Sequence, residues 1–187
     1  MKKLLLLLLA LLFYYNSFAQ DQFTYTKEGL TDFVVVNVDD LSRIDVYNKT
    51  INWVKETYKN PDLVIKTSID GDKVRIAGFK EHLICTRALG IPTCYGGTYT
   101  ISISSKDGKY KFDPSSVTYR LPPTPYSYGV DQNFYLNDGS PYYKKNGKIR
   151  TSWKTVPENI AQFFNDLNLN LKNYILKNHT NKIQEDW

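Results

Sequence analysis

The sequence predicts an α+β domain in which an antiparallel sheet carries two helices on one face. Two Asp-Gly pairs stand between alternating apolar runs, which is typical of β-hairpins. Two longer segments repeat apolar residues at spacings of three and four, which is typical of amphipathic helices. The segments follow the order strand, helix, two hairpins, a loop-rich insert and a final helix. The opposite face of the sheet is therefore expected to be open.

The first strand and helix are predicted within residues 31–58. Residues 33–38 are almost entirely apolar and β-branched, which favours a central strand buried on both faces. Asp39 or Asp40 is expected to cap the helix, because a carboxylate accepts a hydrogen bond from an unpaired amide at the positive end of the helix dipole. Pro61 is expected to end it. The stripe expected to face the sheet consists of Ile44, Tyr47, Ile51, Val54 and Tyr58.

Four further strands are predicted as two hairpins. Residues 63–69 and 74–79 flank one Asp-Gly turn, and residues 99–103 and 110–112 flank the other. Aspartate and glycine tolerate the positive φ angles that tight hairpin turns require. Between the hairpins, residues 82–97 contain proline, two adjacent glycines and both cysteines, so this segment is predicted to be an excursion. Its first part, residues 83–85, is expected to extend the sheet before the chain turns.

A proline- and tyrosine-rich insert is predicted before the final helix. Residues 121–132 are expected to form a surface loop, because three prolines oppose both sheet pairing and helix. Residues 133–153 carry further turn signals and are expected to form a small irregular hairpin. The whole insert spans residues 121–153.

The final helix is predicted to begin near Thr155, which forms a capping box with Glu158. Its apolar stripe comprises Ile160, Phe163, Phe164, Leu167, Leu171, Tyr174 and Ile175. One α+β domain over residues 31–176 is therefore expected, preceded by a lead-in at 20–30 and followed by a frayed tail at 177–187.

Residues 1–19 are predicted to be a secretory signal peptide. Two lysines precede a leucine-rich run at 4–12, and small residues precede the expected cleavage after Ala19. A transmembrane anchor is the alternative, but it requires about 20 apolar residues, and Asn16 and Ser17 interrupt the run. The mature chain is expected to lack a membrane span and to reside in the periplasm or outside the cell.

The charge of the mature chain does not favour nucleic-acid binding. Without residues 1–19, 22 basic residues stand against 19 acidic residues, and the two signs are interspersed. Proteins that bind nucleic acids usually gather basic residues on one face.

Cys85 and Cys94 are the two cysteines of the chain, with eight residues between them. Because oxidising compartments favour disulfides, export predicts a bridge between them, and two separate buried thiols are the alternative. A metal site is not expected, since zinc requires about four ligands and only His82 lies nearby.

Several motifs resemble a known family. The sequence EGLTDFVVV at 28–36, Trp53 in the first helix and the sequence SKDGKYKF at 105–112 are similar to a group of exported bacterial envelope proteins of unknown function. The resemblance covers about residues 28–112. It implies a TATA-binding-protein-like fold with the order β-α-β4-α, in agreement with the order derived above. It supplies no catalytic residues. The insert lies beyond this range, and the cysteine segment within the range is not matched.

No catalytic set or cofactor is expected from the remaining residues. The two histidines are His82, which is expected on the surface, and His179, which lies in the predicted tail. A disulfide would also remove the cysteines as nucleophiles. The carboxylates considered for glycoside hydrolysis are Asp131, Asp138, Glu158 and Asp166, and each is explained equally well as a turn former or helix cap.

Aromatic residues provide the remaining functional signal, because the chain contains 15 Tyr, 9 Phe and 3 Trp. Tyrosine combines a rigid apolar ring with a polar tip, which suits protein contacts and sugar stacking. These rings are predicted either to form a binding surface or to cover a loop-rich edge of the core. The predicted binding residues are Tyr126, Tyr128, Tyr142, Tyr143 and Trp153.

The leading hypothesis is an exported, non-enzymatic binding or protein-interaction module that uses the aromatic insert and the open sheet face. Its partner would be an envelope protein or a glycan. The alternative is a glycan-acting hydrolase or a carbohydrate-binding protein. Nucleic-acid binding by analogy with the TATA-binding fold ranks last, because fold does not determine function.

Overall fold

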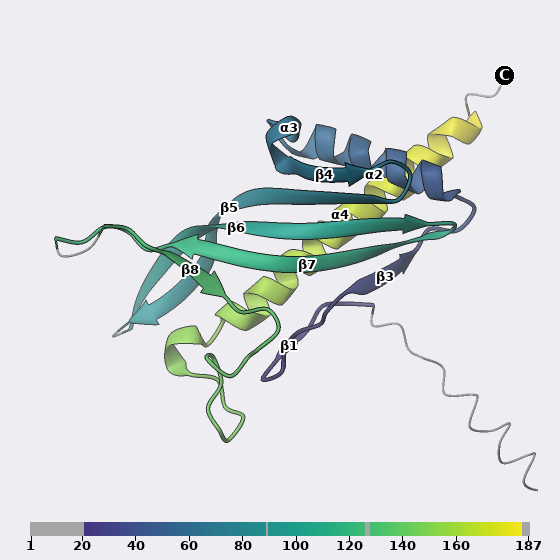
Figure 1. Ribbon diagram of the computed structural model, residues 1–187. Helices are drawn as coiled ribbons and strands as arrows, with labels where there is room; N and C mark the ends of the chain where they lie inside the picture. The colour runs from purple at the N-terminus through teal and green to yellow at the C-terminus, as the bar shows by residue number, and fades with distance from the viewer. Residues whose placement is uncertain (1–20, 89, 126–127, 185–187) are drawn as a thin grey trace, which may run out of the picture.

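The computed structural model describes residues 21–88, 90–125 and 128–184, so the predicted signal peptide at 1–19 lies outside the described residues. The described chain forms a six-stranded antiparallel sheet with the strand order β3-β7-β6-β5-β4, and β8 also pairs with β7. Two long helices lie behind the sheet in Figure 1, so the predicted α+β class with both helices on one face is confirmed.

The elements follow one another in a fixed order along the chain. They are β1 (Tyr25–Thr26), β2 (Gly29–Leu30), β3 (Val34–Asn37), α2 (Arg43–Thr57), α3 (Pro61–Val64), β4 (Ile65–Ile69), β5 (Lys73–Ala88), β6 (Ile91–Lys106), β7 (Lys109–Arg120), β8 (Asp131–Phe134), the 3₁₀ helix η1 (Thr151–Trp153) and α4 (Val156–Gln184). Apart from α3, β8, η1 and the β1–β2 hairpin, this is the predicted order β-α-β4-α.

Strand β3 lies at an edge of the sheet, so its prediction as a central strand is wrong. It pairs only with β7, and its side chains alternate between the two faces. Val34 and Val36 are buried beneath the helices, whereas Val35 is half-buried on the opposite face. Phe33 is exposed and lies under the Lys111 ammonium group, which is 5.0 Å from the ring centroid. The valine run therefore reflects one buried face rather than two.

Helix α2 is capped by Ser42 rather than by Asp39 or Asp40. The Ser42 hydroxyl accepts a hydrogen bond from the Asp45 amide at 3.2 Å, while Asp40 adopts a left-handed turn conformation with φ of 64°. Serine is a favoured capping residue for the same reason as aspartate.

The buried stripe of α2 is rotated from the predicted one. Ile44 remains 49% exposed, whereas Trp53 is completely enclosed and its indole N–H donates to Asn170 Oδ1 on α4 at 2.7 Å. Because the large indole packs toward α4, the face of α2 that carries Trp53 is the buried one. The buried residues of the helix are Val46, Tyr47, Thr50, Trp53 and Val54.

After α2, the chain forms one turn of helix before β4 begins. Pro61 opens α3, and the Asn60 carbonyl accepts bonds from the amides of Leu63 and Val64. Proline suits a first helical position because it has no amide to satisfy. Strand β4 therefore starts at Ile65, two residues later than predicted.

Strands β4 to β7 form a continuous antiparallel meander. The two Asp-Gly turns fall where predicted, with Gly71 and Gly108 both at a φ of 68°. Residues 83–85 extend the sheet as predicted. The excursion predicted for the rest of 82–97 is wrong, because β5 and β6 continue to pair from Ile84 to Ala88 beyond a bulge. The bulge holds His82 at a φ of 54°.

The two cysteines occupy directly opposed positions in this long hairpin. Cys85 faces Cys94 in the β5–β6 register, and the two sulfur atoms are bonded. The predicted disulfide is confirmed, and both cysteines of the chain are used in it.

The insert packs against the beginning of the chain, as Figure 1 shows beside β1. The Leu30 amide donates to the Leu136 carbonyl and the Gly139 amide donates to the Lys27 carbonyl. A side chain at Gly139 would overlap the Thr26 carbonyl oxygen, so glycine permits this close backbone approach. The predicted small irregular hairpin is present around a bridge between Tyr143 and Ile149.

Helix α4 spans the sheet and closes the core. Its predicted stripe is confirmed, since Ile160, Phe164 and Leu171 are fully buried. The helix continues to Gln184, so regular structure extends into the range predicted to be frayed. No helix among the described residues is long and apolar enough to cross a membrane.

Polar contacts fix α4 against the strands. The buried Tyr110 hydroxyl donates to Asn168 Oδ1 at 2.9 Å. Asn165 accepts from the Phe23 amide at 2.7 Å and donates to the Phe23 carbonyl at 3.0 Å, which fixes the chain before β1. Phe23 is itself buried, so the predicted lead-in at 20–30 contributes to the core.

Replacing both Cys85 and Cys94 with serine is expected to lower the free energy of unfolding by about 2–3 kcal/mol, because the bridge constrains a short loop in the unfolded chain. Urea denaturation would measure the change. The matched control is Thr86→Ser with Thr93→Ser, since these residues form the adjacent opposed pair. Equal urea midpoints for the double-serine variant and the native protein would contradict the expectation.

Candidate functional site

The aromatic residues predicted to bind a ligand do not form one surface. Tyr142 is only 3% exposed, and its ring stacks on Phe134 with the centroids 4.5 Å apart. Its hydroxyl accepts a hydrogen bond from the Tyr135 amide at 2.8 Å. The prediction of a surface role is wrong for Tyr142, because the ring fills the core beneath the insert.

Three of the other predicted residues are described, and they differ in exposure. Tyr143 and Trp153 are half-buried, and Trp153 packs on Tyr142 with the ring centroids 4.8 Å apart. Tyr128 is 95% exposed on the loop that follows β7, while Tyr126 lies outside the described residues. The aromatic cluster therefore mainly covers the loop-rich edge of the core.

Burial makes the core tyrosines difficult to ionise. Desolvation is the largest cause that raises the pKa of Tyr142, which reaches about 12, and nearby Tyr119, Tyr135 and Asp138 add to it. The hydrogen bond from the Tyr135 backbone partly opposes this effect. Desolvation raises the pKa of Tyr110 in the same way.

The candidate hydrolytic carboxylates lie on different elements and have local roles. Asp131 on β8 pairs with Arg120 at 3.2 Å, and Asp138 accepts from the Ser140 amide at 2.8 Å within a turn. On α4, Glu158 lies in the first turn, and Asp166 accepts from Gln162 at 2.7 Å. Three of the four carboxylates therefore make local contacts of the kind expected for strand, turn and helix residues.

Neither a catalytic histidine nor a metal site was predicted from the sequence. His82 is exposed at the β5 bulge, and the side chain of His179 lies outside the described part of the chain. Within that part, no group of three or more histidine, cysteine or acidic residues is arranged to hold a metal ion.

The face of the sheet opposite the helices is polar and basic. On β5, Val74 and Ile76 are buried under the helices, so Lys73 and Arg75 point to the other side. The same alternation places Lys111 there on β7. No element of the described chain covers this face (Figure 1).

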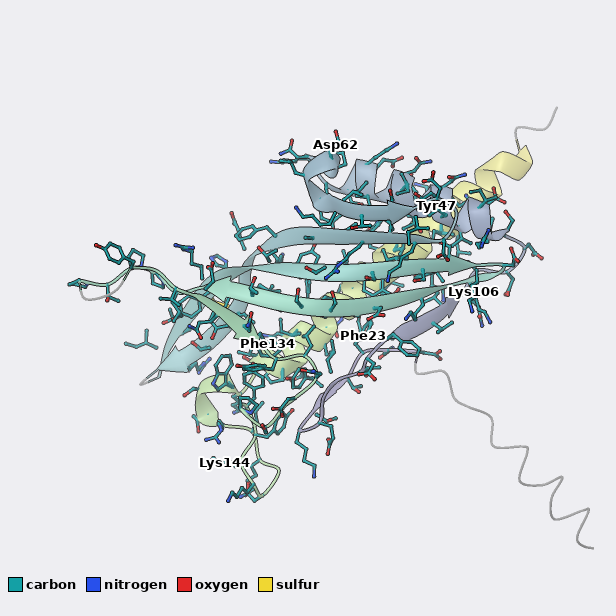
Figure 2. The ribbon with its side chains drawn as sticks, viewed as in Figure 1. Phe23, Tyr47, Asp62, Lys106, Phe134 and Lys144 are labelled. Atoms are coloured by element: carbon teal, nitrogen blue, oxygen red, sulfur yellow. A yellow bond between two sulfur atoms is a disulfide. The ribbon has the colours of Figure 1, made fainter. Side chains whose placement is uncertain are left out.

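Five basic side chains gather where β5, β6 and β7 meet the Asp-Gly turns. Figure 2 shows Lys106 at this end of the sheet. Asp113 is an acidic residue on the same face of β7, and its carboxylate lies 3.0 Å from the Lys111 ammonium group. Three further aspartates lie in the adjoining turns, at positions 70, 72 and 107. We call this cluster the basic patch, and it consists of Lys73, Arg75, Lys106, Lys109 and Lys111.

Hydroxyl groups extend from the basic patch along the open face. They belong to one side of β6, since Ile101 and Ile103 occupy its other side. These residues are Thr98, Thr100, Ser102 and Ser104. The face can thus donate and accept hydrogen bonds beside its positive charge.

A pocket lies at the outer edge of β7, between the part of this strand that pairs with β3 and the part that pairs with β8. Strand β3 pairs with residues 109–112 of β7, and β8 pairs with residues 117–120. Among the described residues, 113–116 have no partner on that side. Pro114 offers no amide there, and Ser115 is the extra residue of a bulge opposite β6.

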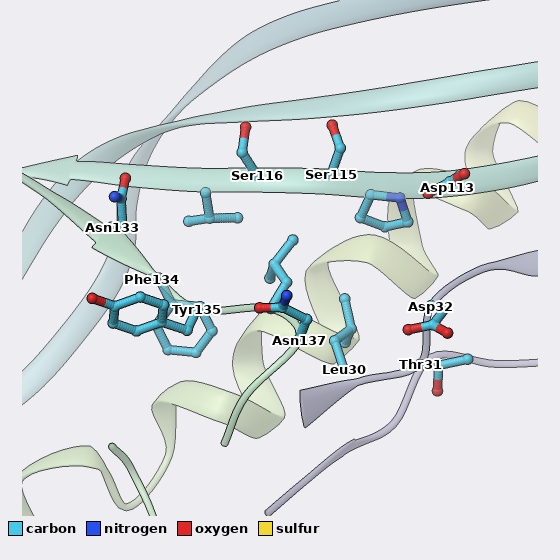
Figure 3. Close-up of a pocket in the computed structure, with 13 residues that line it drawn as sticks. Leu30, Thr31, Asp32, Asp113, Ser115, Ser116, Asn133, Phe134, Tyr135 and Asn137 are labelled. Atoms are coloured by element: carbon cyan, nitrogen blue, oxygen red, sulfur yellow. The ribbon is translucent and has the colours of Figure 1, made fainter. Parts of the chain in front are cut away.

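The space left at this gap is a cavity of about 480 Å³. Its polar lining consists of Thr31, Asp32, Asp113, Ser115, Ser116, Asn133, Tyr135 and Asn137. Figure 3 shows Asp32 and Asp113 at one end and Asn133 with Tyr135 at the other. The two serines project to the same side of β7, as the bulge requires. We call this cavity the edge pocket.

The edge pocket was not predicted from the sequence. No local pattern marks Asp32, Asn133 or Asn137, because each lies in a different segment. Their proximity depends on two strands sharing one edge of β7, which the residue order does not reveal. The alternating lysines of β5 and β7 did indicate the open face.

Comparison with known proteins identifies the fold. Residues 33–120 match the family model described as a domain of unknown function (DUF4468) with TBP-like fold. No curated protein matches the chain.

Two solved structures are similar in fold. A DUF4468 family protein from Bacteroides ovatus has a TM-score of 0.59 and 11% identity, covering 79% of this chain and 86% of the other. A TBP-like protein from Parabacteroides distasonis has a TM-score of 0.56 and 15% identity, covering 76% and 90%.

The stability of the protein is expected to fall as the pH rises from 10 toward 12. The pKa of Tyr142 is higher in the folded protein than the ordinary value of 10.0, so the unfolded chain loses this proton first and unfolding is favoured. Ultraviolet absorbance of tyrosinate would follow the ionisation, and denaturation at each pH would follow the stability.

Tyr142→Phe should remove the absorbance change centred near pH 12. The denatured protein provides the control, because its tyrosines should ionise near pH 10, at about the value for free peptides. If the phenylalanine variant keeps the complete high-pH transition, the assignment to Tyr142 is incorrect.

Proposed function

We propose that this chain, which belongs through residues 33–120 to the DUF4468 family with TBP-like fold, is an exported, non-enzymatic binding module of the bacterial cell envelope. Its partner would be an envelope protein with an acidic surface, held on the open face of the sheet. The single observation that carries this proposal is the basic patch, in which three adjacent strands place five cations on one uncovered face.

Two independent features support export. The first 19 residues have the composition of a secretory signal peptide. The Cys85–Cys94 bridge is a type of bond that persists in oxidising compartments and is rare in the cytosol.

The chemistry of the open face suits a protein partner. Positive charge steers an acidic surface toward it and fixes the orientation of binding. Arg75 presents a planar guanidinium group that binds carboxylates through two parallel hydrogen bonds. Phe79 is 65% exposed beyond the patch on the same side of β5, which provides an apolar contact. The proposed contact thus combines charged, hydroxyl and aromatic groups.

Among the described tyrosines that were predicted to bind a ligand, Tyr128 contributes to this proposal. Tyr128 is strongly exposed, and its loop follows β7 beyond the end of the sheet, as Figure 1 shows. A partner that spans the open face would reach this loop at its margin. The buried rings around Tyr142 support the proposal only by holding the insert in place.

Reversing three charges of the patch should abolish partner binding. The variant is Lys73→Glu with Arg75→Glu and Lys111→Glu, and we expect at least about a tenfold loss of the partner, because like charges across an interface cost several kcal/mol. Tagged full-length protein would be cross-linked in cells of its source and the recovered proteins quantified by mass spectrometry.

The control reverses the same number of exposed lysines elsewhere, at Lys59, Lys144 and Lys177. Figure 2 shows Lys144 far from Lys106, at the tip of the insert. The control should retain a stoichiometric envelope partner. If the patch variant and the control recover the same partners in the same amounts, the proposal fails.

A further inference from the structure

We propose that the edge pocket binds one unit of a neutral saccharide. This site is separate from the basic patch, and the inference does not depend on the protein partner proposed above. It rests on three observations. The strand pairing of β7 has a gap, the lining of the pocket has no cationic residue, and the lining contains both hydrogen-bond donors and acceptors.

The gap gives the pocket a fixed shape. Strand β3 anchors one wall through the pairing of Val34 with Phe112, and β8 anchors the other through the pairing of Phe134 with Val117. The bond from the Leu30 amide to the Leu136 carbonyl joins the two walls across the end. A site built on paired strands is largely preformed, which reduces the entropy lost on binding.

The lining excludes an anionic ligand. It contains Asp32 and Asp113 but no lysine, arginine or histidine. The charge of Asp113 is already offset by Lys111, whose ammonium group lies at 3.0 Å. An added phosphate or carboxylate would lie beside two carboxylates with no facing cation, and this repulsion is unfavourable.

The remaining groups match the hydroxyls of a sugar. Asn133 and Asn137 can each donate and accept a hydrogen bond, and so can the Ser116 hydroxyl. The Ser115 hydroxyl donates to the Thr100 carbonyl at 3.3 Å, so it can still accept a bond from a ligand. The carboxylates accept from hydroxyl groups. Adjacent hydroxyls of a sugar ring both donate and accept, so they can satisfy such mixed groups together, whereas an ammonium group can only donate.

Apolar surface completes the match. Leu30, Val117 and Leu136 line the cavity between the polar groups. Tyr135 is 51% exposed at one end, where its ring can cover the C–H face of a sugar (Figure 3). The volume of about 480 Å³ lies within the range of roughly 300–1,000 Å³ that is usual for small-molecule sites.

The test is a nuclear magnetic resonance titration of the isotopically labelled full chain. Glucose, galactose, mannose and N-acetylglucosamine would be added separately, and the side-chain amides of Asn133 and Asn137 would be followed. At least one sugar should produce saturable shifts in these signals. Asn137→Ala should weaken its binding about tenfold, which corresponds to about 1.4 kcal/mol, because the sugar loses a hydrogen-bond partner in the pocket.

Asn37→Ala is the matched control, because Asn37 lies on β3 and does not line the edge pocket. It should leave the sugar affinity unchanged. Ser116→Ala provides a second pocket variant if Asn137→Ala does not fold. The proposal is overturned if no sugar shifts these signals, if inorganic phosphate or trilysine shifts them while the sugars do not, or if both pocket variants bind like the native protein.

Discussion

The packing of two helices against a single face of the sheet is the constraint on which the rest of the structure depends. Ile76, Ile101 and Ile103 are fully buried in that interface. The Tyr110 hydroxyl and Asn168 pair within it, and the Trp53 indole reaches Asn170 where the helices meet. Buried polar groups must find partners, so these bonds fix how α4 lies across the strands. Most of the apolar surface is thereby buried on one side of the sheet, and the other side is mainly polar.

The central role of β7 links this layering to both proposed sites. Its alternation places Tyr110 and Phe112 in the core and Lys111 on the open face. Its outer edge is shared by β3 and β8, and the gap between them creates the edge pocket. Pro114 and the bulge at Ser115 lie in this unpaired stretch of β7, and they prevent another strand from pairing there. Strand β7 thus contributes to both the basic patch and the edge pocket, which we propose to bind different classes of ligand.

The sequence predicted those features that local chemistry determines. The Asp-Gly turns, the stripe of α4 and the Cys85–Cys94 bridge follow from spacing and compartment. Features that depend on distant partners were not predictable. The valines of β3 are equally compatible with a central strand and with an edge strand. The tyrosines of the insert are equally compatible with a surface position and with a core position. Trp53 rotated α2 through its contact with a helix more than 100 residues away. For the same reason the edge pocket left no signal in any one segment.

In-cell photo-crosslinking is the most direct test of the claim that the open face is the binding surface. A photoreactive amino acid would replace Arg75 or Thr100 on that face, and Lys55 or Lys177 on the helices for comparison. The account predicts that one envelope protein is captured from positions 75 and 100 and not from positions 55 and 177. Capture of that protein from the helical positions alone, or no capture from the open face, would contradict it.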